Sequence, residues 1–196
     1  MSDIPVNGLV LAGGKSRRMG QDKALLDRGG QSQLAYLAGL LDKKVERVFV
    51  SMRADQKDDD ERGQYARIVD RYEDMGPLAG ILSALEEHPD SDWLVVACDL
   101  PNIDGETITH LLENCSANHP FTAYVSSHDG LPEPLCAIYR AGSIGIVRQF
   151  ADEGIYCPRK ILSRSDTFLL EQTNPGSLDN INTPDDLADS ILKAAS

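Results

Sequence analysis

The sequence has little cysteine and histidine, and neither residue forms a recognisable cluster. Its 196 residues include four cysteines and four histidines. The cysteines form no Cys-x-x-Cys pair and have no histidine at ligand spacing; they are Cys98, Cys115, Cys136 and Cys157. A structural zinc site and a disulfide framework are therefore not expected, and reduced cytosolic thiols are the default.

The sequence also lacks a long apolar run and a leader of the secretory type. Residues 1–5 have neither the basic nor the apolar region of a signal peptide. No apolar run approaches the length of a membrane span. We therefore expect a cytoplasmic protein with no membrane partner.

Positive charge is scarce as well. Lysine and arginine total 19 against 31 aspartates and glutamates, which gives a net charge of −12 at pH 7. Such a surface repels nucleic acid and anionic membranes, so no nucleic-acid partner is expected. An anionic substrate would need a local cationic pocket. Only two stretches offer one, the segment 15–23 and the group Arg159, Lys160 and Arg164.

The most informative stretch that is present lies near the start of the chain. The apolar run 6–12 is typical of a buried strand, and it stops at Gly13 and Gly14. Glycines let the backbone turn sharply and bring N–H groups against a ligand. Four cationic side chains follow within the nine positions 15–23; they are Lys15, Arg17, Arg18 and Lys23. A strand, a glycine turn and a cationic segment together suit the phosphates of a nucleotide, whereas a tight turn with a solvated basic loop is the plainer interpretation.

Two common phosphate motifs do not match this stretch. Gly14-Lys15-Ser16 supplies the end of a P-loop, but Leu9 occupies the position of the required first glycine. The dinucleotide fingerprint fails because Gly13 and Gly14 are adjacent and the next glycine is Gly20.

The stretch from Leu11 to Gly20, together with Lys23, resembles the signature of nucleotidyltransferases of the sugar-nucleotide pyrophosphorylase superfold. Within them it is most similar to the molybdenum cofactor guanylyltransferases, the molybdopterin-guanine dinucleotide biosynthesis protein A family. Enzymes of that family join GMP from GTP to molybdopterin and release pyrophosphate. The resemblance touches the start, middle and end of the chain.

The pattern of the whole chain predicts one α/β domain spanning residues 1–196, without repeats or linkers. Apolar and β-branched runs predict strands at 6–12, 45–52, 66–70, 93–98, 121–126, 133–139 and 167–172. Helical spacing predicts helices at 31–44, after Pro77, and at 104–115, 144–150 and 157–162. This alternation predicts a three-layer α/β/α sandwich around a mostly parallel, Rossmann-like sheet. The resemblance implies the nucleotide-diphospho-sugar transferase type of that fold.

Two segments between these elements differ in whether they are expected to contribute to a functional site. The acidic stretch 53–63 is most simply a solvated loop or helix face, and we assign it no function. The segment Gly76-Pro77-Leu78-Ala79-Gly80 reads as an ordinary loop and helix start. Alternatively, its small residues let the backbone approach a base or ribose. The resemblance implies that Gly76 and Gly80 lie beside the nucleotide.

Two aspartates follow predicted strands. Asp99 comes directly after the continuous apolar run 93–98, so it is expected at the carboxyl edge of the sheet, where open α/β sheets bind ligands. A carboxylate there suits Mg²⁺, although an aspartate before a turn also serves as a structural cap. The resemblance implies that Asp99 is the metal ligand. It implies for Asp70, at the end of 66–70, a contact with the nucleotide or with the hydration shell of the metal.

The C-terminal stretch is partly explained by helix capping. Thr183 is expected to cap a helix with Pro184 at its first position. The resemblance implies that Asn180 and Asn182 face the pterin substrate and that the region from Glu133 borders the acceptor side. Arg159 and Lys160 form either an ordinary basic helix face or a site for the acceptor phosphate.

The resemblance implies a mechanism without a protein nucleophile, which agrees with the lack of a convincing catalytic histidine or serine. Lys23, Arg17 and Asp99 are the catalytic candidates, with Lys23 on the α-phosphate and Mg²⁺ on Asp99. The nucleotide and its phosphates are expected to contact Leu11, Ala12, Gly13, Gly14, Lys15, Arg17, Arg18 and Lys23. The implied substrates are GTP and molybdopterin, and the implied protein partners are molybdenum-cofactor biosynthesis proteins or recipient enzymes.

Two alternatives remain open from the sequence. One is a related nucleotidyltransferase that uses CTP or another nucleoside triphosphate with a molybdopterin, sugar phosphate or polyol phosphate acceptor. The other is a nucleotide-binding module without turnover, against which the presence of both Lys23 and Asp99 speaks.

Overall fold

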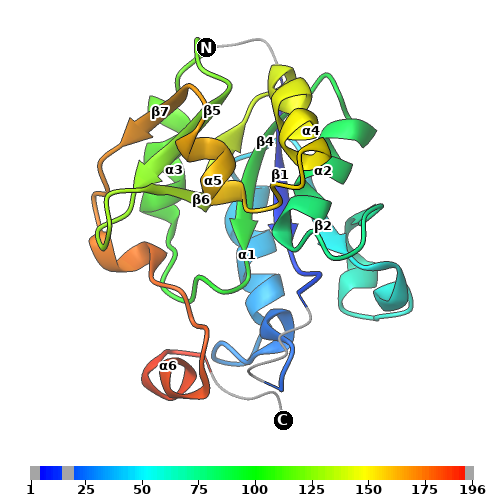
Figure 1. Ribbon diagram of the computed structural model, residues 1–196. Helices are drawn as coiled ribbons and strands as arrows, with labels where there is room; N and C mark the ends of the chain where they lie inside the picture. Colours follow the sequence, from blue (N-terminus) through cyan, green and yellow to red (C-terminus); the bar gives the residue numbers. More distant parts are fainter. Residues whose placement is uncertain (1–4, 15–19, 193–196) are drawn as a thin grey trace.

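The computed structural model describes residues 5–14 and 20–192, and their strands form one mixed sheet (Figure 1). Within that part of the chain the sheet has seven strands in the order β3-β2-β1-β4-β6-β5-β7. All run in one direction except β6, which is antiparallel to both of its neighbours. The strands are β1 (Val6–Leu11), β2 (Val48–Met52), β3 (Ala66–Val69), β4 (Asp92–Ala97), β5 (Phe121–Val125), β6 (Pro132–Tyr139) and β7 (Thr167–Leu170).

Helices cover both faces of the sheet, as the sequence pattern predicts. One core packs α1 (Gln33–Asp42) and α3 (Gly105–Asn114) against one face. The other core packs α2 (Pro77–Glu87), α4 (Ile144–Asp152) and α5 (Pro158–Ser163) against the opposite face (Figure 1). The last helix, α6 (Pro184–Asp189), lies apart from both layers. The predicted three-layer sandwich with a mostly parallel sheet is therefore confirmed.

Strand β4 shows why this sheet is a stable platform. All six of its residues are buried. Leu94 and Val96 point into one core, whereas Trp93 and Val95 point into the other. Complete burial of such side chains contributes about 1.5–3 kcal/mol each. The loop that follows β4 therefore starts from a rigid position between the two helical layers.

Local capping signals place several helix ends. The carboxylate of Asp104 accepts a hydrogen bond from the amide of Thr107 at 2.8 Å and caps α3. The hydroxyl of Thr183 accepts one from the amide of Asp186 at 3.1 Å and caps α6. Pro77 begins α2, where its missing N–H costs nothing. These three predictions from the sequence are confirmed.

The predicted boundaries differ from the observed ones by a few residues. The strand predicted at 45–52 begins only at Val48, because the amide of Val45 still donates to the carbonyl of Leu41 at the end of α1. Among the residues described, no helix combines the length and apolarity needed to cross a membrane.

Candidate active site

A cleft of about 830 Å³ opens where β1, β2, β3 and β4 end. These four strands are mutually parallel, so their carboxyl ends meet at one edge of the sheet. Ligands of open α/β sheets bind at this edge. The cleft walls include many residues that the sequence singles out, namely Leu11, Ala12, Gly13, Gly14, Lys23, Asp70, Gly76, Gly80 and Asp99.

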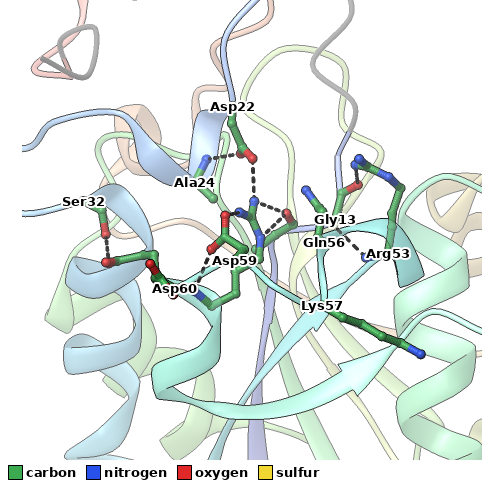
Figure 2. Close-up of polar contacts among 12 residues, drawn as sticks. Gly13, Asp22, Ala24, Ser32, Arg53, Gln56, Lys57, Asp59 and Asp60 are labelled. Atoms are coloured by element: carbon green, nitrogen blue, oxygen red, sulfur yellow. Dashed lines mark hydrogen bonds and ion pairs between the residues drawn. The ribbon is translucent and has the colours of Figure 1, made fainter.

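The glycine turn is held from behind by two arginines. The guanidinium of Arg62 donates to the carbonyl of Ala12 at 2.7 and 3.2 Å, and that of Arg53 donates to the carbonyl of Gly13 at 2.5 Å (Figure 2). In a trans peptide the C=O and the next N–H point in opposite directions. The amides of Gly13 and Gly14 therefore point away from the two guanidinium groups. Such amides are the donors that a phosphate requires.

Part of the predicted cationic segment falls outside the described residues. This concerns residues 15–19 and therefore the predictions for Lys15, Arg17 and Arg18. Lys23, on the far side of that gap, is described and lines the cleft.

Lys23 meets the end of β4 and the C-terminal segment. Its Nζ lies 3.9 Å from Oδ2 of Asp99. It also donates to the carbonyl of Ile181 and, at 3.4 Å, to Oδ1 of Asn182. The amide of Ile181 in turn donates to the carbonyl of Asp99 at 2.9 Å. Residues from three distant parts of the chain thus form one polar cluster at the edge of the cleft.

The carboxylate of Asp99 is poorly hydrated. Burial raises its pKa, and the nearby charge of Lys23 opposes that rise. Its Oδ1 is buried and accepts no hydrogen bond from the described residues. A buried oxygen of this kind costs free energy unless a ligand contacts it. In the portion of the chain that is described, no group of three or more acidic, histidine or cysteine side chains could hold a metal ion.

Asp70 directly follows β3 and lines the cleft. The hydroxyl of Ser51 donates to its Oδ1 at 2.7 Å. Burial raises the pKa of Asp70 to about 6, although Ser51 and Arg53 both lower it. A Cβ on Gly13 would lie 3.0 Å from Oδ2 of Asp70, so the turn passes directly over this carboxyl.

The two glycines at the start of α2 have different physical roles. Gly76 adopts a positive φ of 57°, a conformation that favours glycine. At Gly80, an added Cβ would lie 2.2 Å from the Oγ of Ser51. Gly80 therefore lets α2 approach β2 closely, which is a packing role in addition to its position on the cleft wall.

A second hollow of about 470 Å³ adjoins the cleft, and both are bordered by Gly76 and Leu135. Asn180, Glu133 and Arg159 line this hollow. Arg159 pairs with Glu133 at 2.9 Å. Asn182, the other asparagine that the resemblance places toward the acceptor, contacts Lys23 and is not among the residues that line this hollow. Lys160 is exposed and is not part of the wall.

The stretch 53–63 is predicted from its sequence to be a solvated loop or helix face without a function. This prediction is wrong for Arg62 and incomplete for Arg53. Arg62 is fully buried, and Arg53 lines the cleft. The acidic neighbours of Arg62 indicate a solvent-exposed segment. However, Asp59 forms an ion pair with Arg62 at 3.0 Å, and this pairing compensates the charge of Arg62 in the interior. No site role is predicted from the sequence for Ser51 or Arg53, although both line the cleft. Their position at the carboxyl end of β2, which pairs with β1, is the signal that could have indicated this role.

A parallel-sheet edge with a glycine turn, a lysine and a poorly hydrated carboxylate is the arrangement expected of a nucleotidyltransferase of the nucleotide-diphospho-sugar transferase type. Comparison with known proteins agrees. The model of the family described as MobA-like NTP transferase domain matches residues 8–168. The chain belongs to this family, and the resemblance seen in its sequence is confirmed.

Individual relatives point the same way. A molybdenum cofactor biosynthesis bifunctional protein of Synechocystis sp. is 39% identical over 95% of this chain and 54% of its own length. A probable molybdenum cofactor guanylyltransferase of Nostoc sp. is 30% identical over 93% of this chain and 89% of its own length. A counterpart of the same description from Bacillus mycoides is matched over 66% of its length. The chain thus spans about half to two thirds of the length of some relatives.

Solved structures share the fold. Molybdopterin-guanine dinucleotide biosynthesis protein A from Archaeoglobus fulgidus has a TM-score of 0.75 and 26% identity, with 93% of this chain and 95% of that chain covered. A 2-C-methyl-D-erythritol 4-phosphate cytidylyltransferase from Thermus thermophilus has a TM-score of 0.69 at 13% identity, covering 93% of this chain and 96% of that chain. The latter shows the fold alone.

Proposed function

We propose that this protein transfers GMP from GTP to the phosphate of molybdopterin and releases pyrophosphate. The observation that carries the proposal is the cluster of Lys23, Asp99 and Asn182, which lies beside the large cleft. The second hollow adjoins that cleft. Two neighbouring hollows suit a reaction that joins two substrates. The names of the relatives supply the identity of those substrates.

The chemistry is a displacement at phosphorus. A phosphate oxygen of the acceptor attacks the α-phosphorus of GTP, the bond from the α-phosphorus to the bridging oxygen breaks, and pyrophosphate leaves with the electron pair. Because the acceptor phosphate is already ionised at neutral pH, no general base is required. The barrier is dominated by repulsion between anions, so positioning and positive charge lower it.

The residues at the sheet edge have distinct tasks in this proposal. The amides of Gly13 and Gly14, with Lys15 and Arg17, hold the β- and γ-phosphates as charge develops on them. Lys23 neutralises the α-phosphate. Leu11, Ala12, Asp70, Gly76 and Gly80 form the wall against which the nucleoside rests. Asn180 and Asn182 bind the acceptor.

Asp99 fits a magnesium ion. Its buried Oδ1 has no hydrogen-bond donor among the described residues, and Mg²⁺ commonly takes one or two carboxylates together with substrate phosphates. When bound, Mg²⁺ neutralises charge on the phosphate oxygens. Lys23, 3.9 Å from the other oxygen of Asp99, opposes the rise in the pKa of Asp99 that burial causes. The proposal places the reaction in the cytoplasm, as the scattered cysteines predict.

The test is an assay of pyrophosphate release with purified protein and Mg²⁺. GTP is compared with CTP, and molybdopterin with sugar phosphates. The proposal requires release with GTP and molybdopterin together. Release with CTP alone would contradict the assignment of the base, and tight nucleotide binding without release for any acceptor would show a binding module instead.

A further inference from the structure

Arg62 is a charged side chain with no exposed surface, and the reaction described above does not use it. Its guanidinium has three partners. Nε and Nη2 donate to the carbonyl of Ala12, Nη2 also donates to Oδ2 of Asp22 at 2.7 Å, and Nη1 donates to Oδ2 of Asp59 at 3.0 Å. Figure 2 shows the carboxylates of Asp22 and Asp59 approaching from different sides. A planar guanidinium is suited to several directed bonds of this kind.

Two of these partners, Ala12 and Asp22, flank the stretch 13–21 in the sequence. Ala12 directly follows β1, and Asp22 directly precedes Lys23. Oδ1 of Asp22 accepts a hydrogen bond from the amide of Ala24 at 3.0 Å and so caps the short turn Lys23–Leu25. Through one guanidinium, Arg62 therefore connects the glycine turn with the turn that carries Lys23.

Arg62 cannot itself bind a phosphate. Its side chain is fully buried, and the two carboxylates more than balance its charge. Its influence on an anionic ligand must pass through the groups it holds. Chief among them is the peptide between Ala12 and Gly13, whose carbonyl it fixes and whose N–H faces the other way. Holding donors in place before the ligand arrives lowers the cost of ordering them on binding.

We propose that Arg62 is a positioning residue for the triphosphate. It sets the direction of the Gly13 amide and fixes the distance between that amide and Lys23. The part of this inference that concerns the KM for GTP rests on the proposed function. It predicts that a change at Arg62 weakens the binding of a triphosphate chain specifically, beyond any loss of folding stability.

Two variants and one control test this. Arg62→Lys keeps the charge but cannot span three partners. Asp59→Ala is the milder change. It removes the carboxylate that accepts from the amide and the guanidinium of Arg62, but it leaves the contacts of Arg62 with Ala12 and Asp22 in place. Asp59 is also not part of the cleft wall. The matched control is Arg140→Lys. Arg140 likewise pairs with an aspartate, the buried Asp92, and donates to a backbone carbonyl, but Asp92 begins β4 at the opposite edge of the sheet.

The measurements are the Kd for inorganic tripolyphosphate by calorimetry, the KM for GTP and the free energy of unfolding of each variant. Arg62→Lys should raise the Kd and the KM about tenfold, since small displacements of binding groups have large effects. Asp59→Ala should raise both less, and Arg140→Lys should leave both within about twofold at comparable loss of stability.

The results separate this inference from the proposed function. If Arg62→Lys leaves the Kd for tripolyphosphate unchanged, or if Arg140→Lys raises it equally, the positioning role is wrong. A parent protein that binds tripolyphosphate but forms no product would contradict the proposed transferase, while the ratio of Kd values would still decide the role of Arg62. A parent that does not bind tripolyphosphate overturns both.

Discussion

The Nζ of Lys23 and Oδ2 of Asp99 lie 3.9 Å apart, and each side chain exposes only 18% of its surface. The pair brings Lys23, which follows the signature stretch 11–20, to Asp99, which lies two residues after the end of β4. Both charges are partly withdrawn from water, so the cation acts strongly on whatever anion enters beside it.

Replacement of Lys23 by alanine should reduce kcat much more than it reduces stability. The charge is proposed to act on the transition state, and loss of one such group lowers kcat about 10²–10³-fold. The measurement is steady-state pyrophosphate release together with thermal unfolding. Lys43→Ala, at the exposed end of α1, is the control and should retain full activity. Equal activity in Lys23→Ala and the parent would contradict the role of Lys23.

Replacement of Asp99 by asparagine should weaken the response to magnesium. The neutral amide offers a poorer ligand than a carboxylate, so the Mg²⁺ concentration for half-maximal activity should rise by about tenfold or more. The measurement is a Mg²⁺ titration of turnover at saturating GTP. Asp166→Asn is the same change at an exposed site before β7 and should leave the titration unaltered. An unaltered titration in Asp99→Asn would refute the metal assignment.

Asp70 should make stability depend on pH. Its pKa is raised from 3.8 to about 6 in the folded protein, so its contribution to stability is fully present below pH 3.8 and is lost as the pH rises through 6. Asp70→Asn removes this loss and should be more stable than the parent by about 3 kcal/mol above pH 7. Denaturant unfolding at several pH values measures the difference.

The same experiment has an internal control. The hydroxyl of Ser51 lowers the pKa of Asp70, so Ser51→Ala should move the titration of this carboxyl to higher pH. Carbon NMR of the Asp70 carboxyl reports it directly. A stability difference between Asp70→Asn and the parent that does not vary between pH 4 and 7 would contradict burial as the cause.

Substitution of Gly80 by alanine should destabilise the fold. The new Cβ would lie 2.2 Å from Oγ and 2.9 Å from Cβ of Ser51, and such overpacking costs about 1–3 kcal/mol. Gly39→Ala in α1 is the matched control, because a Cβ there meets nothing within 4 Å. It should stabilise the helix by about 0.5–1 kcal/mol. Restored stability in the double variant with Ser51→Gly would confirm the clash, whereas a fully stable Gly80→Ala would disprove it.

The layers of the fold could be predicted because their signals are local. The apolar run that became β4 is buried on both faces, and the cap at Asp104 needs only the next three residues. Asp99 could also be placed, because a residue after a parallel strand lies at a known edge. These inferences require no knowledge of distant contacts.

The polar partners could not be predicted in the same way. Arg62 reaches Ala12 across 50 positions, and its burial depends on how an acidic loop folds back on the glycine turn. The contact of Lys23 with Asn182 spans 159 positions, and no local pattern in the sequence indicates it. Charge patterns near a residue predict solvation well only where no distant partner withdraws it from water.

The most direct test of the central claim follows the α-phosphorus of GTP. With GTP labelled at that atom, molybdopterin and Mg²⁺, the account predicts that the label enters a product joined to the pterin, with one pyrophosphate released for each label transferred. Lys23→Ala should lose this transfer while remaining folded. Label that stays in GTP, or leaves as free GMP without joining the pterin, would contradict the account.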